Sequence, residues 1–335
     1  MRPFVYTRVD DAAKAVSSAA ANTQASFLAG GTNIVDLMKE DVARPTELID
    51  INRLKLAQIR LIGEGANRGN IAIGALAKNT ETANHPLVRQ NYPLLTQAIL
   101  AGASGQIRNM ATNGGNLNQR TRCTYFYDVA MPCNKREPGT GCAALEGINR
   151  MHAIFGWSEK CVAVYPSDMA IALAALDATV KVQGANGATR SIPFAEYHRL
   201  PGDNPEKDNT LQPGELITEI ELPKNNFAGK SYYLKIRDRA SYAFALLSVA
   251  AGLEMNGATI KQARIAMGGV AHKPWRALEA EKFLSGKAAT EANFAAAAEA
   301  EMKSAKPLEH NKFKVELGKR AIVRALSMAM SGGKA

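Results

Sequence analysis

All four cysteines of this chain of 335 residues lie in one segment, at Cys123, Cys133, Cys142 and Cys161. An iron–sulfur cluster bound by four thiolates accommodates long and irregular loops between its ligands. Zinc sites usually contain closely spaced cysteine pairs, and this segment has none. Two disulfides are a third alternative, which the absence of a secretory signal peptide disfavours, and unrelated thiols are the fourth. The spacing favours the cluster and leaves the other three open.

The residues around the cysteines suit a buried metal site. Aromatic side chains that can exclude water occur at Tyr125, Phe126, Tyr127, Phe155 and Trp157. Basic side chains that can offset thiolate charge occur at Arg120, Arg122, Lys135 and Arg136. An ordinary hydrophobic core explains the aromatic residues equally well, and the two interpretations are compatible.

Two glycine loops indicate a binding site for a phosphate-bearing ligand. In FLAGGTNIVDLM, Gly30 and Gly31 follow an apolar strand and precede a helical pattern, so backbone N–H groups can approach a phosphate closely. The alternative is a tight turn whose helix is capped by Thr32 or Asn33. A second loop, ATNGGNLN, raises the expectation of a dinucleotide. Neither loop has Walker A or Rossmann spacing, which predicts a different fold.

The order of motifs predicts more than one domain, as expected for a chain of this length. Strand and helix patterns alternate in the first part, and a hairpin connects LAQIRLI to NIAIGA. The sequence LPKNNFAGK is the predicted domain boundary. Beyond it, Asn256 and Gly257 favour a tight hairpin turn, and helical patterns begin near Arg276. The last third is therefore a small α+β domain.

Composition excludes several classes of protein. Hydrophobic residues make up 46% and charged residues 21%, which is typical of a soluble globular protein. The longest apolar runs are much shorter than the roughly 20 residues of a membrane-spanning helix. The net charge of +10 is spread along the chain without a basic run or a nucleic-acid-binding motif, so we expect no nucleic acid as a partner.

Four motifs, FLAGGTNIVDLM, GASGQIRNMATNGGN, YPSD and YYLKIRDRASYAFALLSVA, occur in an order that resembles the FAD-binding subunits of the molybdenum hydroxylases, the xanthine dehydrogenase family. The resemblance covers nearly the whole chain. Most of those subunits lack the cysteine segment. Here RTRCTYFYD, PCNKR, GCAALEG and SEKC resemble the [4Fe–4S] segment of the FAD subunits of periplasmic aldehyde oxidases. A comparable insertion occurs in the flavoprotein of 4-hydroxybenzoyl-CoA reductase.

The resemblance implies an α+β fold with two domains. Residues 1–226 would form a PCMH-type FAD-binding domain in two α+β parts, with a [4Fe–4S]-binding insertion at about residues 120–162. Residues 227–335 would form a C-terminal flavoprotein domain, in which helices pack on an antiparallel sheet.

The resemblance also implies specific cofactor contacts. A first loop would wrap the FAD pyrophosphate with Ser26, Phe27, Leu28, Ala29, Gly30, Gly31, Thr32, Asn33 and Ile34. A second would consist of Thr112, Asn113, Gly115 and Asn116. Arg122 would also bind the cofactor, Asp168 would bind ribityl or ribose hydroxyls, and Ile217 and Lys235 would lie beside the isoalloxazine.

The four cysteines would ligate a [4Fe–4S] cluster. From the residues alone, a helix cap is the favoured role for Asp168 and a surface position is favoured for Lys235.

The implied function is electron transfer in a heterotrimeric molybdenum-dependent aldehyde oxidoreductase. A large molybdenum-cofactor subunit and a small [2Fe–2S] subunit would be the partners, and FAD would pass electrons to an external acceptor. The alternatives are an acyl-CoA or heterocycle hydroxylase or reductase subunit, and a stand-alone flavoprotein with a structural metal site. We expect a periplasmic location through co-export with a partner subunit, with the cytoplasm as the alternative.

Overall fold

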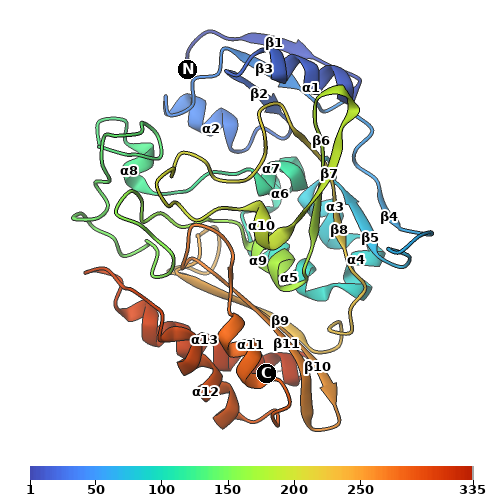
Figure 1. Cartoon of the computed structure of the whole chain (residues 1–335), viewed down its shortest axis with the longest axis vertical. Helices are drawn as coiled ribbons and strands as arrows, with labels where there is room; N and C mark the ends of the chain where they lie inside the picture. The colour runs from blue at the N-terminus through green and yellow to red at the C-terminus, as the bar shows by residue number, and fades with distance from the viewer. Residues whose placement is uncertain (334–335) are drawn as a thin grey trace.

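A computed structural model describes residues 1–333. It is a mixed α and β structure with three sheets, and the predicted α+β class is confirmed. The N-terminal part contains two of the sheets, and the C-terminal part packs below them in Figure 1. Within residues 1–333, none of the helices has the length and apolar content needed to cross a bilayer.

A three-stranded parallel sheet begins the chain, in the order β1-β3-β2. Its elements are β1 (Val5–Arg8), α1 (Ala12–Ala21), β2 (Ala25–Leu28), α2 (Ile34–Lys39) and β3 (Glu47–Asp50). The side chain of Asp11 accepts a hydrogen bond from Lys14 N and so caps α1. The predicted strand, glycine turn and helix around Gly30 are therefore present as β2 and α2.

The second sheet has five strands in the order β4-β5-β8-β6-β7, and each neighbouring pair is antiparallel. The strands are β4 (Ile59–Leu61), β5 (Ile71–Gly74), β6 (Thr179–Gln183), β7 (Thr189–Pro193) and β8 (Leu216–Leu222). The hairpin predicted between the first two strands is present, with Gly65 and Gly69 at positive φ in its turn.

Short helices and one 3₁₀ turn connect the strands of this second sheet. They are α3 (Asn79–Asn84), α4 (Pro86–Asn91), α5 (Pro93–Ala101), α6 (Gly105–Met110), α7 (Asn113–Leu117), α8 (Thr124–Tyr127), α9 (Asp168–Ala175), α10 (Phe194–Tyr197) and the 3₁₀ turn η1 (Ala185–Gly187). Every residue of α9 is buried, and the sequence MAIALAA that follows Asp168 is apolar on all sides. This helix lies in the main hydrophobic core and fixes the turn before it.

The cysteine segment runs between α7 and α9 and forms an irregular layer on one side of the molecule, around α8 (Figure 1). Besides α8 it contains only isolated bridges, which join Cys133 to Cys142 and Ser158 to Cys161. Most of its backbone is therefore held by turns and side chains rather than by a sheet.

The C-terminal part contains the antiparallel sheet β12-β11-β10-β9. Its elements are β9 (Ser231–Ile236), β10 (Leu247–Asn256), β11 (Thr259–Gly268), β12 (Trp275–Arg276), α11 (Leu278–Leu284), α12 (Glu291–Met302) and α13 (Phe313–Met330). The three helices cover one face of the sheet. The other face packs on α5 and α9, so the two parts share a continuous core. The hairpin predicted at Asn256 and Gly257 joins β10 to β11.

Candidate functional site

The first glycine loop leaves the end of β2 and leads into α2. Ser26, Phe27 and Leu28 lie on the strand, residues 29–33 form the turn, and Ile34 begins the helix. Gly31 has a φ of 74°, a conformation that L side chains rarely adopt. A Cβ atom on Gly30 would lie 2.0 Å from the carbonyl oxygen of Met110. The backbone at Gly30 therefore lies directly against the chain that leads into the second loop.

The second glycine loop is fixed by its own side chains. Thr112 Oγ1 accepts a hydrogen bond from the N–H of Gly115 at 3.2 Å and caps α7. Asn113 is fully buried and its amide bonds to Asn79 and Thr82, so this side chain supports the loop from inside. Asn116 is only partly buried and accepts a hydrogen bond from the Ser167 hydroxyl. The loop is thereby connected to the YPSD turn before α9.

Asn33 connects the first loop to the cysteine segment. Its Oδ1 accepts a hydrogen bond from the backbone N–H of Arg120 at 3.1 Å. Its Nδ2 is buried without a hydrogen-bond partner among the described residues. Because buried donors are almost always paired, this amide is a donor available to a bound ligand.

A cavity of about 450 Å³ lies beyond the second loop, but none of its lining residues belongs to either glycine loop. The cysteine segment forms one wall, the YPSD turn a second, and the adjoining ends of β10 and β11 a third. Arg122, Cys123 and Asp168 line this cavity. Ile217 and Lys235 are not among its lining residues. Ile217 is 4% exposed and belongs to the hydrophobic core behind the sheet.

Asp168 and Lys235 form a buried ion pair. The Lys235 ammonium lies 2.7 Å from Asp168 Oδ2 and also donates to the carbonyl of Ala101. The Tyr233 hydroxyl donates to Asp168 Oδ1 at 2.6 Å. The side chains of Asp168 and Lys235 are only 8% and 5% exposed. Two simpler interpretations are therefore wrong: Lys235 is not a surface lysine, and the residue that caps α9 is Ser167.

Arg122 extends along the cavity wall. Its Nη1 lies 2.9 Å from Asp36 on α2, and its guanidinium lies 5.4 Å from the centre of the Phe244 ring. Its Nε is buried without a hydrogen-bond partner among residues 1–333. The Arg122 side chain is thus held in position and keeps one donor that no described residue uses.

All four cysteines line a second, smaller cavity next to the first. Each is a free thiol, which removes the disulfide alternative, and their common cavity argues against unrelated thiols.

Cys161 donates a hydrogen bond to Cys142, which lowers the pKa of Cys142 to about 6. Among the described residues, no set of three or more His, Cys, Asp or Glu side chains has the spacing for a single metal ion. This finding supports neither a zinc site nor an iron–sulfur cluster.

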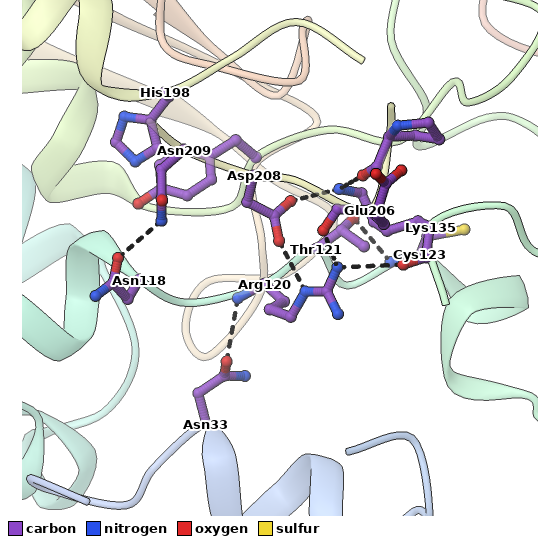
Figure 2. A network of polar contacts seen from close by, with 12 residues as sticks. Asn33, Asn118, Arg120, Thr121, Cys123, Lys135, His198, Glu206, Asp208 and Asn209 are labelled. Carbon is purple, nitrogen blue, oxygen red and sulfur yellow. Dashed lines mark hydrogen bonds and ion pairs between the residues drawn. The ribbon is translucent and has the colours of Figure 1, made fainter. Parts of the chain in front are cut away.

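A polar network that the sequence did not reveal joins the first glycine loop, through Asn33, to the smaller cavity (Figure 2). Asp208 forms ion pairs with Arg120, at 2.7 Å, and with Lys135. Lys135 lines the smaller cavity, is 1% exposed, and also donates to the carbonyl of Pro205 at 2.7 Å. The guanidinium of Arg120 stacks over Phe126, another lining residue, at 4.8 Å. Asp208 lies in a polar loop whose sequence contains no motif, so only the structure identifies it.

Comparison with known families gives two matches that together cover most of the chain. Residues 2–225 match the FAD binding domain in molybdopterin dehydrogenase. Residues 232–329 match the CO dehydrogenase flavoprotein C-terminal domain. The first match contains both glycine loops and the whole cysteine segment, and the second contains Lys235 and all the helices on the C-terminal sheet.

Individual relatives agree with these matches. The aldehyde oxidoreductase FAD-binding subunit PaoB of Escherichia coli (strain K12) is 49% identical over 98% of this chain and 99% of its own length. The glyceraldehyde dehydrogenase medium chain of Sulfolobus acidocaldarius is 28% identical over 85% of this chain and 82% of its own. A solved structure of carbon monoxide dehydrogenase from Hydrogenophaga pseudoflava superimposes with a TM-score of 0.76 at 26% identity, over 99% of this chain and 98% of that one.

Proposed function

Because this chain belongs to the FAD-binding subunits of the molybdenum hydroxylase family, we propose that it is the electron-output subunit of an aldehyde oxidoreductase. The observation that carries the aldehyde assignment is the high identity to the E. coli aldehyde oxidoreductase subunit over almost the full length of both chains. The presence of the cysteine segment within that aligned length adds support.

The residues of this chain fit FAD as the resident cofactor. The close approach of Gly30 to Met110 places two backbone loops side by side for the pyrophosphate. Beside them, Asn33 Nδ2 is a buried donor without a partner in the described part of the chain. Arg122 and Asp168 line the large cavity and would contact the rest of the cofactor. When bound, FAD accepts and releases electrons singly or in pairs.

The role that we propose for the buried Lys235 is to position Asp168. It holds Asp168 in place and neutralises this carboxylate in the cavity wall. Asp168 Oδ1 is in turn fixed by Tyr233, so the orientation of the carboxyl group is set before a cofactor binds. This arrangement suits a hydrogen-bond acceptor for ribityl or ribose hydroxyls, whose position has to be defined.

We also propose that Cys123, Cys133, Cys142 and Cys161 ligate a [4Fe–4S] cluster. Two observations support this assignment: the four thiols share one small cavity, and the buried Lys135 ammonium lines the same cavity. Iron–sulfur clusters take four thiolate ligands, and Lys135 would offset part of their negative charge.

The chain would act in a heterotrimer. The proposed partners are a large molybdenum-cofactor subunit, where the aldehyde reacts, and a small [2Fe–2S] subunit that relays electrons to the flavin. An external acceptor would then take the electrons. The proposed compartment is the periplasm, reached by co-export with a partner. Cell fractionation tests that compartment, since recovery of the chain from the cytoplasm alone contradicts it.

The first experiment measures iron, acid-labile sulfide and flavin in the full chain purified without oxygen. About four irons and four sulfides per chain, with one flavin, support both cofactor assignments. Zinc in place of iron contradicts the cluster assignment but leaves the family assignment intact. Co-purification of two further subunits supports the heterotrimer, whereas aldehyde turnover by this chain alone contradicts the electron-output role.

A second experiment separates two roles for the cluster with Cys133→Ser. Failure to assemble the trimer indicates a structural role, and an intact trimer with slowed turnover indicates electron storage. Ala143→Ser is the matched control, because Ala143 lines the same small cavity without a thiol. It should retain iron and assembly.

A further inference from the structure

The two cavities share a wall. Cys123, Thr121 and Tyr125 line both the large cavity and the small one. Cys133, Cys142 and Cys161 line only the small cavity. Cys123 is therefore the proposed cluster ligand that borders directly on the proposed flavin cavity.

His152 lies at the same wall and contacts this cysteine. Its Nε2 atom is 3.1 Å from Cys123 Sγ, and the residue lines the large cavity. Its Nδ1 atom is buried without a hydrogen-bond partner among the described residues. A thiolate bound to iron has no proton to donate, so Nε2 must carry the hydrogen and donate it to the sulfur.

From this geometry we propose that His152 is a positioning residue that raises the reduction potential of the cluster through its hydrogen bond to Cys123. This inference rests on the proposed cluster. Reduction adds one electron to the cluster and increases the negative charge on its sulfur ligands. A hydrogen bond to such a ligand is stronger when the charge is greater, so it stabilises the reduced state more than the oxidised state.

The position of His152 is fixed from the C-terminal part of the chain. Lys314, a fully buried residue of α13, donates to the His152 carbonyl at 2.9 Å and to the Gly269 carbonyl at 2.7 Å. Asn311 also donates to the His152 carbonyl, at 3.2 Å. The Tyr125 ring packs against the imidazole, with 6.1 Å between ring centres. The donor geometry is thus set by the protein, as expected for a residue that tunes a metal site from outside its ligands.

The test compares His152→Leu, which removes the donor, with His152→Gln, whose Nε2 replaces the imidazole Nε2. The full chain is purified without oxygen, and its cluster is titrated potentiometrically with electron paramagnetic resonance as the readout. We expect His152→Leu to lower the equilibrium constant for reduction of the cluster about tenfold. This corresponds to a reduction potential about 59 mV lower for one electron. We expect His152→Gln to retain most of the wild-type potential.

His198→Leu is the matched control. His198 is also buried, but its Nε2 contacts the Leu117 carbonyl rather than a cysteine. It should leave the potential unchanged.

Three results would contradict either the proposed role of His152 or the proposed cluster, and they can be told apart. An unchanged potential in His152→Leu with full iron content overturns the role of His152 and leaves the cluster assignment intact. Loss of iron in both His152 variants, but not in His198→Leu, also overturns it, because the imidazole would then only fill space. A wild-type chain without iron and sulfide overturns the proposed cluster itself.

Discussion

Gly30 is the residue on which the contact between the two glycine loops depends. A methyl group at this position would overlap the Met110 carbonyl, which is backbone and cannot rotate away. We expect Gly30→Ala to separate the loops, reduce the flavin content and destabilise the fold by about 1–3 kcal/mol, as overpacking usually does. Flavin per chain and urea unfolding measure the two effects.

Gly105→Ala is the control for this prediction, because the added methyl group would have no described residue within 4 Å apart from its own neighbours along the chain. It should keep both the flavin and the stability of the wild type. A Gly30→Ala protein with full flavin content and unchanged stability would show that the loops do not need this close approach.

A second prediction at the level of single residues concerns the ion pair of Asp168 and Lys235. Lys235→Met leaves the Asp168 carboxylate buried without its counter-charge, so we expect a loss of about 3–5 kcal/mol in the free energy of unfolding. Adding Asp168→Asn to the same chain should recover a large part of that loss, because the buried charge is then absent. Chemical denaturation of both single variants and the double variant gives the coupling energy.

The comparison pair for this cycle is Lys14 and Asp10, which are both well exposed on the surface. Lys14→Met should change stability very little. If the double variant of Asp168 and Lys235 were no more stable than Lys235→Met alone, the loss would come from packing of the lysine stem rather than from charge.

At the scale of elements, Asp208 ties the loop between α10 and β8 to the cysteine segment and, through Arg120, to the first glycine loop. Burial alone would raise the pKa of Asp208, but the charges of Arg120 and Lys135 hold it well below its usual range. Since the folded pKa lies below the unfolded value of about 3.9, the stabilisation is complete above about pH 4 and decreases as the pH falls further.

The prediction from this network concerns Asp208→Asn. At pH 7 we expect it to destabilise the chain by about 3–5 kcal/mol, because Lys135 is then buried without a counter-charge. The difference from wild type should shrink as the pH is lowered below about 4, and unfolding measured across pH shows this. Asp238→Asn, in an exposed pair with Arg150, is the control. A difference that stays constant down to low pH would contradict the assigned role of the carboxylate.

The elements were predictable where the signal is local. Alternating apolar residues and the Asn256–Gly257 turn predict the hairpin β10–β11. The glycine turn after FLA predicts β2 and α2. Both structures depend on the backbone conformations that neighbouring residues favour. Asp208 and His152 could not be predicted in this way. Their importance comes from partners far away in the sequence, Arg120 and Lys135 for one and Cys123 for the other. A single sequence does not encode such pairs as a pattern.

At the scale of the whole molecule, the C-terminal part holds the cysteine segment in place. The backbone of Ile154 bonds to Val270, and the Trp157 indole donates to the Lys306 carbonyl at 2.7 Å. Lys314 reaches from α13 to the His152 carbonyl. The helices on the far side of the sheet are therefore connected to the wall between the two cavities, which explains how one part of the chain can position a group in the other.

Lys314 gives this connection a measurable pH dependence. Burial lowers its pKa to about 7, whereas an unfolded lysine has a pKa of about 10.4. Between these values the unfolded chain binds more protons than the folded chain, so stability increases with pH by up to about 1.4 kcal/mol per unit. Relative to Lys314→Met, we expect the wild type to gain stability from about pH 7 to pH 10.

Unfolding measured across this range, with Lys312→Met as the exposed control from the same region, tests the expectation. The stability curve of the control should run parallel to that of the wild type, because Lys312 is exposed. If the stability curve of Lys314→Met also ran parallel to that of the wild type, the Lys314 ammonium would keep its charge in the folded chain. The two carbonyls that it binds, His152 and Gly269, would then be solvating a charged group inside the protein, and α13 would hold the cavity wall by charge as well as by packing.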